Sequence, residues 1–221
     1  MSWLFDFIRS SVGRKAVMAA SGLVLFGFVV AHMIGNLQVY LGRDVLNAYG
    51  LSLRALGHGA GLWIARLGLL GAVAAHIWSA TSLTLQNRAA RPVGYREREN
   101  LESTYASRTM RWSGVILLLF VVYHLMHFTF GNVHPSFREG DVYHNFIAGF
   151  QVPWVSAFYI LAMLALGLHL WHGVWSMLQT VGLSHARYNH LRKAFATLIT
   201  VVVVAGNISF PLAVLTGLIH E

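Results

Sequence analysis

The stretch that decides the fold is Trp154–Gln179, WVSAFYILAMLALGLHLWHGVWSMLQ, in which the only ionisable side chains are those of two histidines and one tyrosine. It is longer than the roughly 20 apolar residues that cross a bilayer. His169 and His172 lie three positions apart inside it. Polar side chains in the middle of a membrane span are costly and usually serve a function. The stretch therefore predicts a membrane-spanning helix that contributes to a functional site.

The composition extends this interpretation to the whole chain. Of its 221 residues, 56% are hydrophobic and only 11% are charged, whereas soluble domains carry roughly 25% charged residues. The absence of cysteine excludes disulfides and thiolate ligands for zinc or iron–sulfur clusters from this chain. The net charge of +8 does not predict nucleic-acid binding, because the basic residues cluster in the connections between apolar ranges.

Five apolar ranges are long enough to span a membrane, at about 16–40, 62–85, 112–131, 152–178 and 194–219. They predict an all-α integral membrane fold with five transmembrane helices in a single domain, residues 1–221. The preceding segment Met1–Lys15 mixes aromatic and basic residues. It predicts a short amphipathic helix at the membrane interface, with a partly ordered tail as the alternative.

The basic residues also predict the orientation of the chain. Twelve of the 16 Lys and Arg residues fall on one side of the expected membrane: Arg9, Arg14, Lys15, Arg88, Arg91, Arg96, Arg98, Arg108, Arg111, Arg187, Arg192 and Lys193. Positive charge favours the cytoplasmic side, so we expect a cytoplasmic N-terminus. The connection Asn87–Arg111 is the longest on that side. It is either a docking segment for a soluble partner or a solvated loop.

Six histidines lie within the expected spans: His32, His76, His124, His127, His169 and His172. Two internal repeats distinguish among them. Ser21–His32 and Ser113–His124 are identical at seven of twelve positions. Likewise, His76-Ile-Trp precedes Gln86 by the same spacing with which His169-Leu-Trp precedes Gln179.

Each repeat joins two spans of the same direction, so equal spacing puts its two histidines at similar depth. This predicts the pairs His32/His124 and His76/His169. His127 and His172 have no counterpart in the repeats, and we treat them as second-line residues. A single membrane histidine can also simply hydrogen-bond a carbonyl of a neighbouring helix.

Four histidines on four helices, in two pairs, are typical of bis-histidine haem binding. This site needs two opposed imidazoles and no carboxylate or thiolate from the protein. The pattern predicts two haems b, with each pair of histidines supplying the two axial ligands of one iron. A non-haem di-iron site or a proton-coupled transporter would be expected to place carboxylates centrally in the spans, where none occurs.

At this point the chain resembles a known family, the cytochrome b membrane anchors of succinate:quinone oxidoreductases, of the five-helix, di-haem type. The resemblance covers nearly the whole chain. The residues that carry it are Ser21-Gly22 through His32-Met33, His76, Ser113-Gly114 through His124-Leu125, Phe158-Tyr159-Ile160, His169 and Gly173-Val174-Trp175-Ser176. It implies His32 and His124 as ligands of the outer haem, and His76 and His169 as ligands of the inner haem.

The resemblance also implies the partners and the role. A flavoprotein subunit would act on succinate or fumarate, and an iron–sulfur subunit would exchange electrons with this anchor. The anchor itself would have no catalytic residue and would pass electrons to a quinone, with menaquinone expected, in the bacterial cytoplasmic membrane. Some fumarate reductases of this type carry a glutamate just before the helix-four histidine, for proton movement. Leu166-Gly167-Leu168 stands there in this chain, which puts that route in doubt.

Several points stay open at the level of sequence. Hypothetical quinone contacts are His127, Asn36 and His58 on the outer side, or Arg9, Ser10 and Arg14 on the inner side. Arg111, Arg14 or Lys15 could pair with haem propionates, although simple orientation-setting cations are the favoured interpretation. The alternative functions are a stand-alone di-haem electron shuttle and a haem-free helical anchor.

Overall fold

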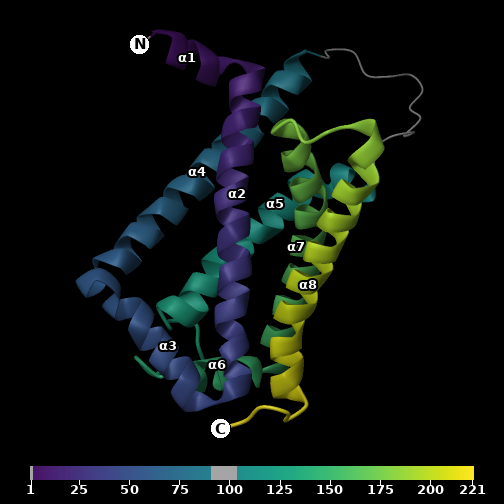
Figure 1. The fold of residues 1–221 in the computed structure, drawn as a ribbon. Coiled ribbons are helices and arrows are strands. Elements are labelled where there is room, and N and C mark those ends of the chain that lie inside the picture. The colour runs from purple at the N-terminus through teal and green to yellow at the C-terminus, as the bar shows by residue number, and fades with distance from the viewer. Residues whose placement is uncertain (1, 91–103) are drawn as a thin grey trace.

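The computed structural model describes residues 2–90 and 104–221, and its elements are helices (Figure 1). In order, they are α1 (Ser2–Arg9), α2 (Ser11–Asn36), η1 (Leu37–Leu41), α3 (Arg43–Ala55), η2 (Leu56–Gly59), α4 (Ala60–Ala89), α5 (Tyr105–His124), η3 (Leu125–Thr129), α6 (Val142–Phe150), α7 (Pro153–Thr180), η4 (Ala186–Tyr188) and α8 (Asn189–Leu215). No strand occurs in these two ranges.

Five of the helical stretches are long and apolar enough to cross a membrane. They contain α2, α4, α5, α7 and α8, and the five expected apolar ranges fall on these helices in the same order. The prediction of an all-α, multi-pass integral membrane protein is therefore confirmed. Large apolar side chains cover the outside of the bundle, as Trp63, Leu119 and Leu198 illustrate with more than half of their surface exposed.

The N-terminal segment departs from its expected bounds. A short helix is present, but it ends at Arg9, and residues 11–15 already belong to α2. The break occurs at Ser10, whose backbone is extended and whose hydroxyl oxygen accepts a hydrogen bond from the N–H of Gly13 at 3.0 Å. Such N-capping satisfies a free donor of a new helix, so it starts α2 here.

The long helices pack as two similar pairs, α2 on α4 and α5 on α7, with α8 against α7. Figure 1 shows α1 at one end of the bundle, and α3, α6 and the C-terminus at the other. We call these the α1 end and the α6 end. The basic residues Arg14, Arg88 and Arg111 lie at the α1 end.

The helices α3 and α6 were not expected from the sequence. Each lies in a connection at the α6 end, and α6 is almost entirely buried, with Ile147 fully covered and Phe150 at 3% exposure. Its side chains join one apolar core with Met33, Val155 and Val203 from the long helices. The nine residues of α6 are too few to span a bilayer, so the hydropathy pattern alone does not reveal it.

Some expectations lie outside the described residues. Three of the basic residues used for orientation, Arg91, Arg96 and Arg98, fall in this group, as does most of the connection considered as a docking segment. The cytoplasmic placement of the N-terminus stays a prediction.

Candidate functional site

Two pairs of histidines meet inside the bundle. The rings of His76 on α4 and His169 on α7 have centroids 6.2 Å apart and planes inclined by 58°. The rings of His32 on α2 and His124 on α5 have centroids 5.8 Å apart and planes at 89°. The structure thus brings together the residues of each predicted pair, while their role as ligands stays a prediction. We call them the inner pair, His76/His169, and the outer pair, His32/His124.

The inner pair is held by two serines in equivalent positions. The Oγ of Ser21 on α2 lies 3.3 Å from Nδ1 of His76, and the Oγ of Ser113 on α5 lies 3.2 Å from Nδ1 of His169. Both serines are buried. Each hydroxyl donates its own proton to a helix carbonyl, that of Val17 at 2.7 Å for Ser21 and that of Met110 at 2.9 Å for Ser113.

These hydrogen bonds favour one tautomer of each ring. A hydroxyl that donates to a carbonyl can accept from Nδ1–H, and this arrangement places the proton on Nδ1 of both rings. The lone pair of Nε2 is then free in His76 and in His169. Metal-bound histidines commonly have this arrangement, in which a second group orients the ring and selects the tautomer.

Glycines beside the two serines lie next to the rings of the inner pair, with room for ordinary van der Waals contact. A Cβ atom added to Gly22 would lie 3.4 Å from Cε1 of His76, and one added to Gly114 would lie 3.7 Å from Cε1 of His169. The repeated Ser-Gly dipeptide is therefore a contact to the inner pair. In the sequence, the dipeptide indicated only the depth of His32 and His124. Its contact with the inner pair could not be predicted from the repeats.

The outer pair has a more aromatic surrounding. The ring of His32 stacks on Phe28 one helical turn earlier, at 5.3 Å, and that of His124 packs on Phe120 at 5.7 Å. Nδ1 of His124 lies 3.3 Å from the hydroxyl of Tyr159 on α7. These phenylalanines are the ones that the repeat places four residues before each histidine.

His127 and His172 occupy different places from the paired histidines. His127 is fully buried, its ring stacks on His134 at 4.8 Å, and its Nδ1 lies 3.1 Å from the Tyr159 hydroxyl, while its Nε2 has no hydrogen-bond partner. It lies in η3, a widened π-helical turn that continues α5. His172 is partly buried and packs edge-on against Trp175 at 6.4 Å.

The donor set fits a haem. Among the described residues, no three His, Cys, Asp or Glu side chains form a cluster that could hold a metal ion, and the four histidines of the predicted pairs meet two by two. Two imidazoles are the number that bis-histidine haem takes from the protein, since the macrocycle supplies the other four ligands. The protonated Nδ1 atoms of the inner pair leave a free nitrogen on each ring for such a bond.

Helix geometry also gives the separation of the two pairs. Eleven residues separate Ser21 from His32, and eleven separate Ser113 from His124. At 1.5 Å per residue, the inner and outer pairs lie about 16 Å apart along the bundle. Together they reach across about half of a hydrocarbon core that is about 30 Å thick.

The two alternative groups of hypothetical quinone contacts, His127 with Asn36 and His58 or Arg9 with Ser10 and Arg14, stay predictions. Ser10 caps α2, Arg14 hydrogen-bonds the side-chain oxygen of Gln86 at 3.4 Å, and His127 is buried. Asn36 ends α2, and His58 lies in the turn η2 with a left-handed backbone (φ 55°). A quinone site is therefore not assigned to any of them.

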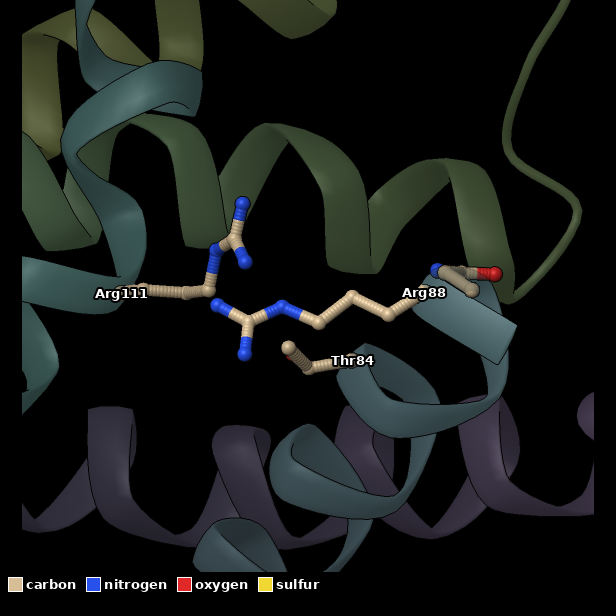
Figure 2. A pocket seen from close by; sticks show the side chains of 4 residues that line it. Thr84, Arg88 and Arg111 are labelled. Carbon is tan, nitrogen blue, oxygen red and sulfur yellow. The ribbon is translucent and has the colours of Figure 1, made fainter. Parts of the chain in front are cut away.

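A cavity of about 450 Å³ opens at the α1 end, between α4 and α5. It is lined by Thr84, Asn87, Arg88 and Arg111. Figure 2 shows the guanidinium groups of the two arginines side by side in it.

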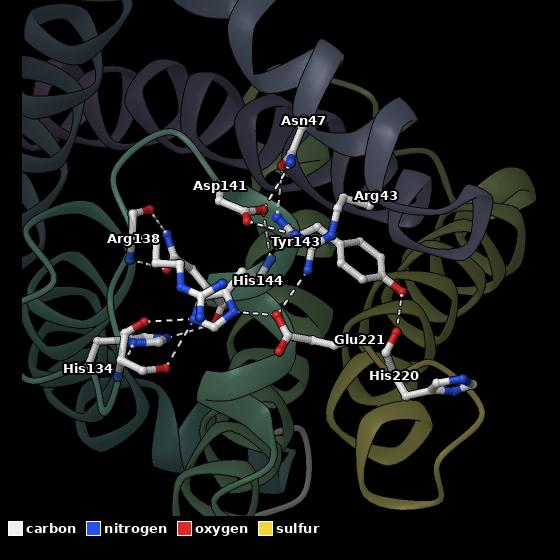
Figure 3. Close-up of polar contacts among 11 residues, drawn as sticks. Arg43, Asn47, His134, Arg138, Asp141, Tyr143, His144, His220 and Glu221 are labelled. Carbon is white, nitrogen blue, oxygen red and sulfur yellow. Dashed lines mark hydrogen bonds and ion pairs between the residues drawn. The ribbon is translucent and has the colours of Figure 1, made fainter.

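A polar network joins the elements at the α6 end (Figure 3). Arg43 on α3 makes ion pairs with Asp141 and with Glu221, each at 3.0 Å. Asn47 donates to Asp141 at 2.9 Å, and Nδ1 of His144 pairs with Glu221. Burial on its own would raise the pKa of Asp141, but the hydrogen bonds from Asn47 and from the His144 backbone N–H, together with the charge of Arg43, outweigh it and lower that pKa.

Comparison with known proteins gives one finding. The family described as "Succinate dehydrogenase/Fumarate reductase transmembrane subunit" matches residues 84–208, which is more than half of the chain and includes His124 and His169. No curated protein and no solved structure matches the chain significantly.

Proposed function

The chain belongs to the family of succinate dehydrogenase/fumarate reductase transmembrane subunits, and from this premise we propose that it passes electrons between an iron–sulfur subunit and a membrane quinone by means of two haems b. The family is one of haem-containing cytochrome b anchors and implies membership in a complex with other subunits. The number of haems, their ligands and the route of the electrons are our proposal.

The observation that carries the proposal is the meeting of four histidines as two pairs. Each pair joins helices that are far apart in the sequence, α4 with α7 and α2 with α5. His76 and His169 would hold the inner haem, and His32 and His124 the outer haem. A bound haem supplies a one-electron couple between ferric and ferrous iron.

The protein's own residues orient the ligands and keep water away. Ser21 and Ser113 accept from Nδ1–H of the inner histidines, which directs Nε2 of each ring away from the supporting helix. Phe28 and Phe120 pack on the rings of the outer pair. Apolar surroundings of this kind help to set the redox potential of a metal site.

In this proposal, the two ends of the bundle have different roles in the complex. The basic α1 end would face the cytoplasm and dock the iron–sulfur subunit, which in turn contacts a flavoprotein subunit. The quinone would be menaquinone, and the membrane the bacterial cytoplasmic membrane. Succinate oxidation and fumarate reduction use the same electron path in opposite directions.

The optical spectrum of the purified protein tests the haem part of the proposal. Reduction with dithionite is expected to give the α band of a b-type cytochrome, and a pyridine haemochrome assay is expected to find two haems per chain. A protein without that band would be a haem-free anchor, and the proposal would be wrong.

Co-purification tests the complex. After gentle solubilisation, a tagged chain is expected to bring with it subunits that contain covalently or tightly bound flavin and iron–sulfur clusters. A chain that carries two haems but no such subunits would instead be a stand-alone electron shuttle.

A further inference from the structure

Among the residues that the structure describes, the wall of the cavity between α4 and α5 has two positive charges and no negative charge. Arg88 and Arg111 extend into it from opposite helices, and Thr84 and Asn87 complete the lining (Figure 2). Both arginine side chains are exposed, and two guanidinium groups that line one cavity repel each other. An anion between them would turn this repulsion into two attractive contacts.

The positive groups of this region are paired differently from those at the other end. Within residues 2–90 and 104–221, the ion pairs are those of Arg43 and His144 with Asp141 and Glu221, all at the α6 end. At the α1 end, Arg192 and Lys193 lie over the ring of Trp175 instead.

Arg88 and Arg111 have neither kind of partner in the part of the chain that the structure describes. No carboxylate lies within ion-pair distance of either guanidinium there, and no aromatic ring lies beneath either. Their donors are available for a ligand.

The cavity lies where the apolar surface of the bundle ends. Leu85 and Trp112, each close in sequence to an arginine of the cavity, expose 59% and 73% of their surface. An exposed tryptophan at the end of an apolar span is typical of the membrane interface. Along α5, Arg111 precedes Ser113, the serine beside His169, by two residues, a helical rise of about 3 Å.

We propose that Arg88 and Arg111 form a two-point binding site for an oxoanion, either a carboxylate or a phosphate. Guanidinium groups bind both through paired N–H donors. Thr84 and Asn87 can donate to the remaining oxygens.

Two sources at this depth carry such a group. One is the carboxylate side chains of a haem held by His76 and His169, and this source rests on the proposed function. The other is the phosphate of an anionic phospholipid, which basic pockets between membrane helices bind, and this source does not depend on a haem.

The test removes both charges and compares the result with an equal loss elsewhere. The variant Arg88→Gln/Arg111→Gln is made together with Arg54→Gln/Arg66→Gln, which removes two exposed arginines from α3 and from the far part of α4. The full chain, in its complex where one forms, is reconstituted in nanodiscs of phosphatidylcholine containing a small fraction of phosphatidylglycerol.

Two measurements distinguish the sources. Native mass spectrometry counts the phosphatidylglycerol that stays bound, and a lipid phosphate in the site predicts that the cavity variant retains it about tenfold more weakly than the wild type. Spectroelectrochemical titration follows the haems, and a haem carboxylate in the site predicts that one midpoint potential falls, because lost positive charge favours the ferric state. The control pair is expected to show neither change.

Equal lipid retention and equal midpoint potentials in the cavity variant and the wild type would overturn the proposal, as would the same changes in the control. A wild type without haem would refute the proposed function, but the lipid measurement would still decide the site. If the glutamine variant does not accumulate, Arg88→Lys/Arg111→Lys keeps the charge and loses the paired donors. It is expected to bind the anion several-fold more weakly than the wild type, and wild-type behaviour would contradict the two-point geometry.

Discussion

The inner and outer histidine pairs differ in what holds their rings. In the inner pair, each ring donates to a buried serine, and the two serines occupy equivalent positions on α2 and α5. In the outer pair, His124 meets the phenol of Tyr159, and the described contacts of His32 are with the rings of Phe28 and His124. The inner pair is therefore symmetric and polar in its support, and the outer pair is asymmetric and aromatic.

This difference predicts how the two pairs respond to substitution of their neighbours. A serine that donates to a carbonyl favours the tautomer of its histidine in which Nδ1 carries the proton. Tyr159 lies within hydrogen-bond distance of both His124 and His127, so the proton positions of these two histidines are coupled, and the ring of His127 in turn stacks on His134. We therefore expect changes at the α6 end to affect the outer pair and to leave the inner pair unchanged.

The largest effect is expected from removing a ligand of one pair. His169→Ala should leave one haem per chain, because the ring facing His76 is lost, whereas His172→Ala should leave both, since His172 packs on Trp175. Pyridine haemochrome stoichiometry measures the outcome. The reverse result would show that the inner pair has been assigned to the wrong histidine.

Removing the support of the inner pair should have the next largest effect. Ser113→Ala leaves the Nδ1–H of His169 without its acceptor, and such losses around metal ligands cost about 10- to 100-fold in affinity. We expect weaker retention of one haem and a rise in its midpoint potential, because the imidazole becomes less basic. Ser79→Ala is the control, since the buried Ser79 hydroxyl donates to the His76 carbonyl and touches neither ring. An equal effect of both substitutions would refute the role of Ser113.

Glycine substitutions should show how tightly each of the two regions is packed. In Gly149→Ala the new Cβ would lie 2.9 Å from Cε1 of His127 and 3.1 Å from Nε2 of His134, which is too close. A loss of about 1–3 kcal/mol is expected, as for other overpacked cores. Gly114→Ala, with 3.7 Å to His169, should stay within about 1 kcal/mol of the wild type. Thermal unfolding in detergent measures both, and equal melting temperatures would contradict the contact geometry.

A smaller and more selective effect is expected for Tyr159→Phe. The substitution removes the polar partner that His124 has among the described residues and should raise the midpoint potential of the outer haem alone. Redox titration resolves the two haems, and the Ser113→Ala protein, whose shift should fall on the other haem, is the matched comparison. Coincident shifts in the two variants would mean that the pairs are not independently supported.

The smallest effect is expected from acid. Because the pKa of Asp141 is lowered in the folded protein, its contribution to stability is complete above its ordinary value, about pH 4, and is lost as pH falls through the folded pKa. Acid should therefore destabilise the α6 end. The hydrogen-exchange protection of α3 and α6 should fall before protection near the inner pair falls. Asp141→Asn should make the exchange of α3 and α6 less dependent on pH in this range. Unchanged pH dependence would contradict the contribution of this carboxylate.

Much of the fold could be predicted from the sequence because a bilayer imposes a length. Any helix that crosses it needs about 20 apolar residues, so five apolar ranges predicted five long helices. The same rule did not predict α6, whose nine residues are buried among the long helices. Its position depends on Gly149, which lets the helix lie against His127.

The histidines show the same division between sequence and structure. The repeats by themselves determined which histidines share a depth, since rise per residue is constant in a helix. Only the tertiary structure decided which ring faces which, because the rotation of one helix against another depends on contacts between distant residues. Ser21 with His76, and Ser113 with His169, are such contacts. Each joins residues more than 50 positions apart, and no local pattern specifies them.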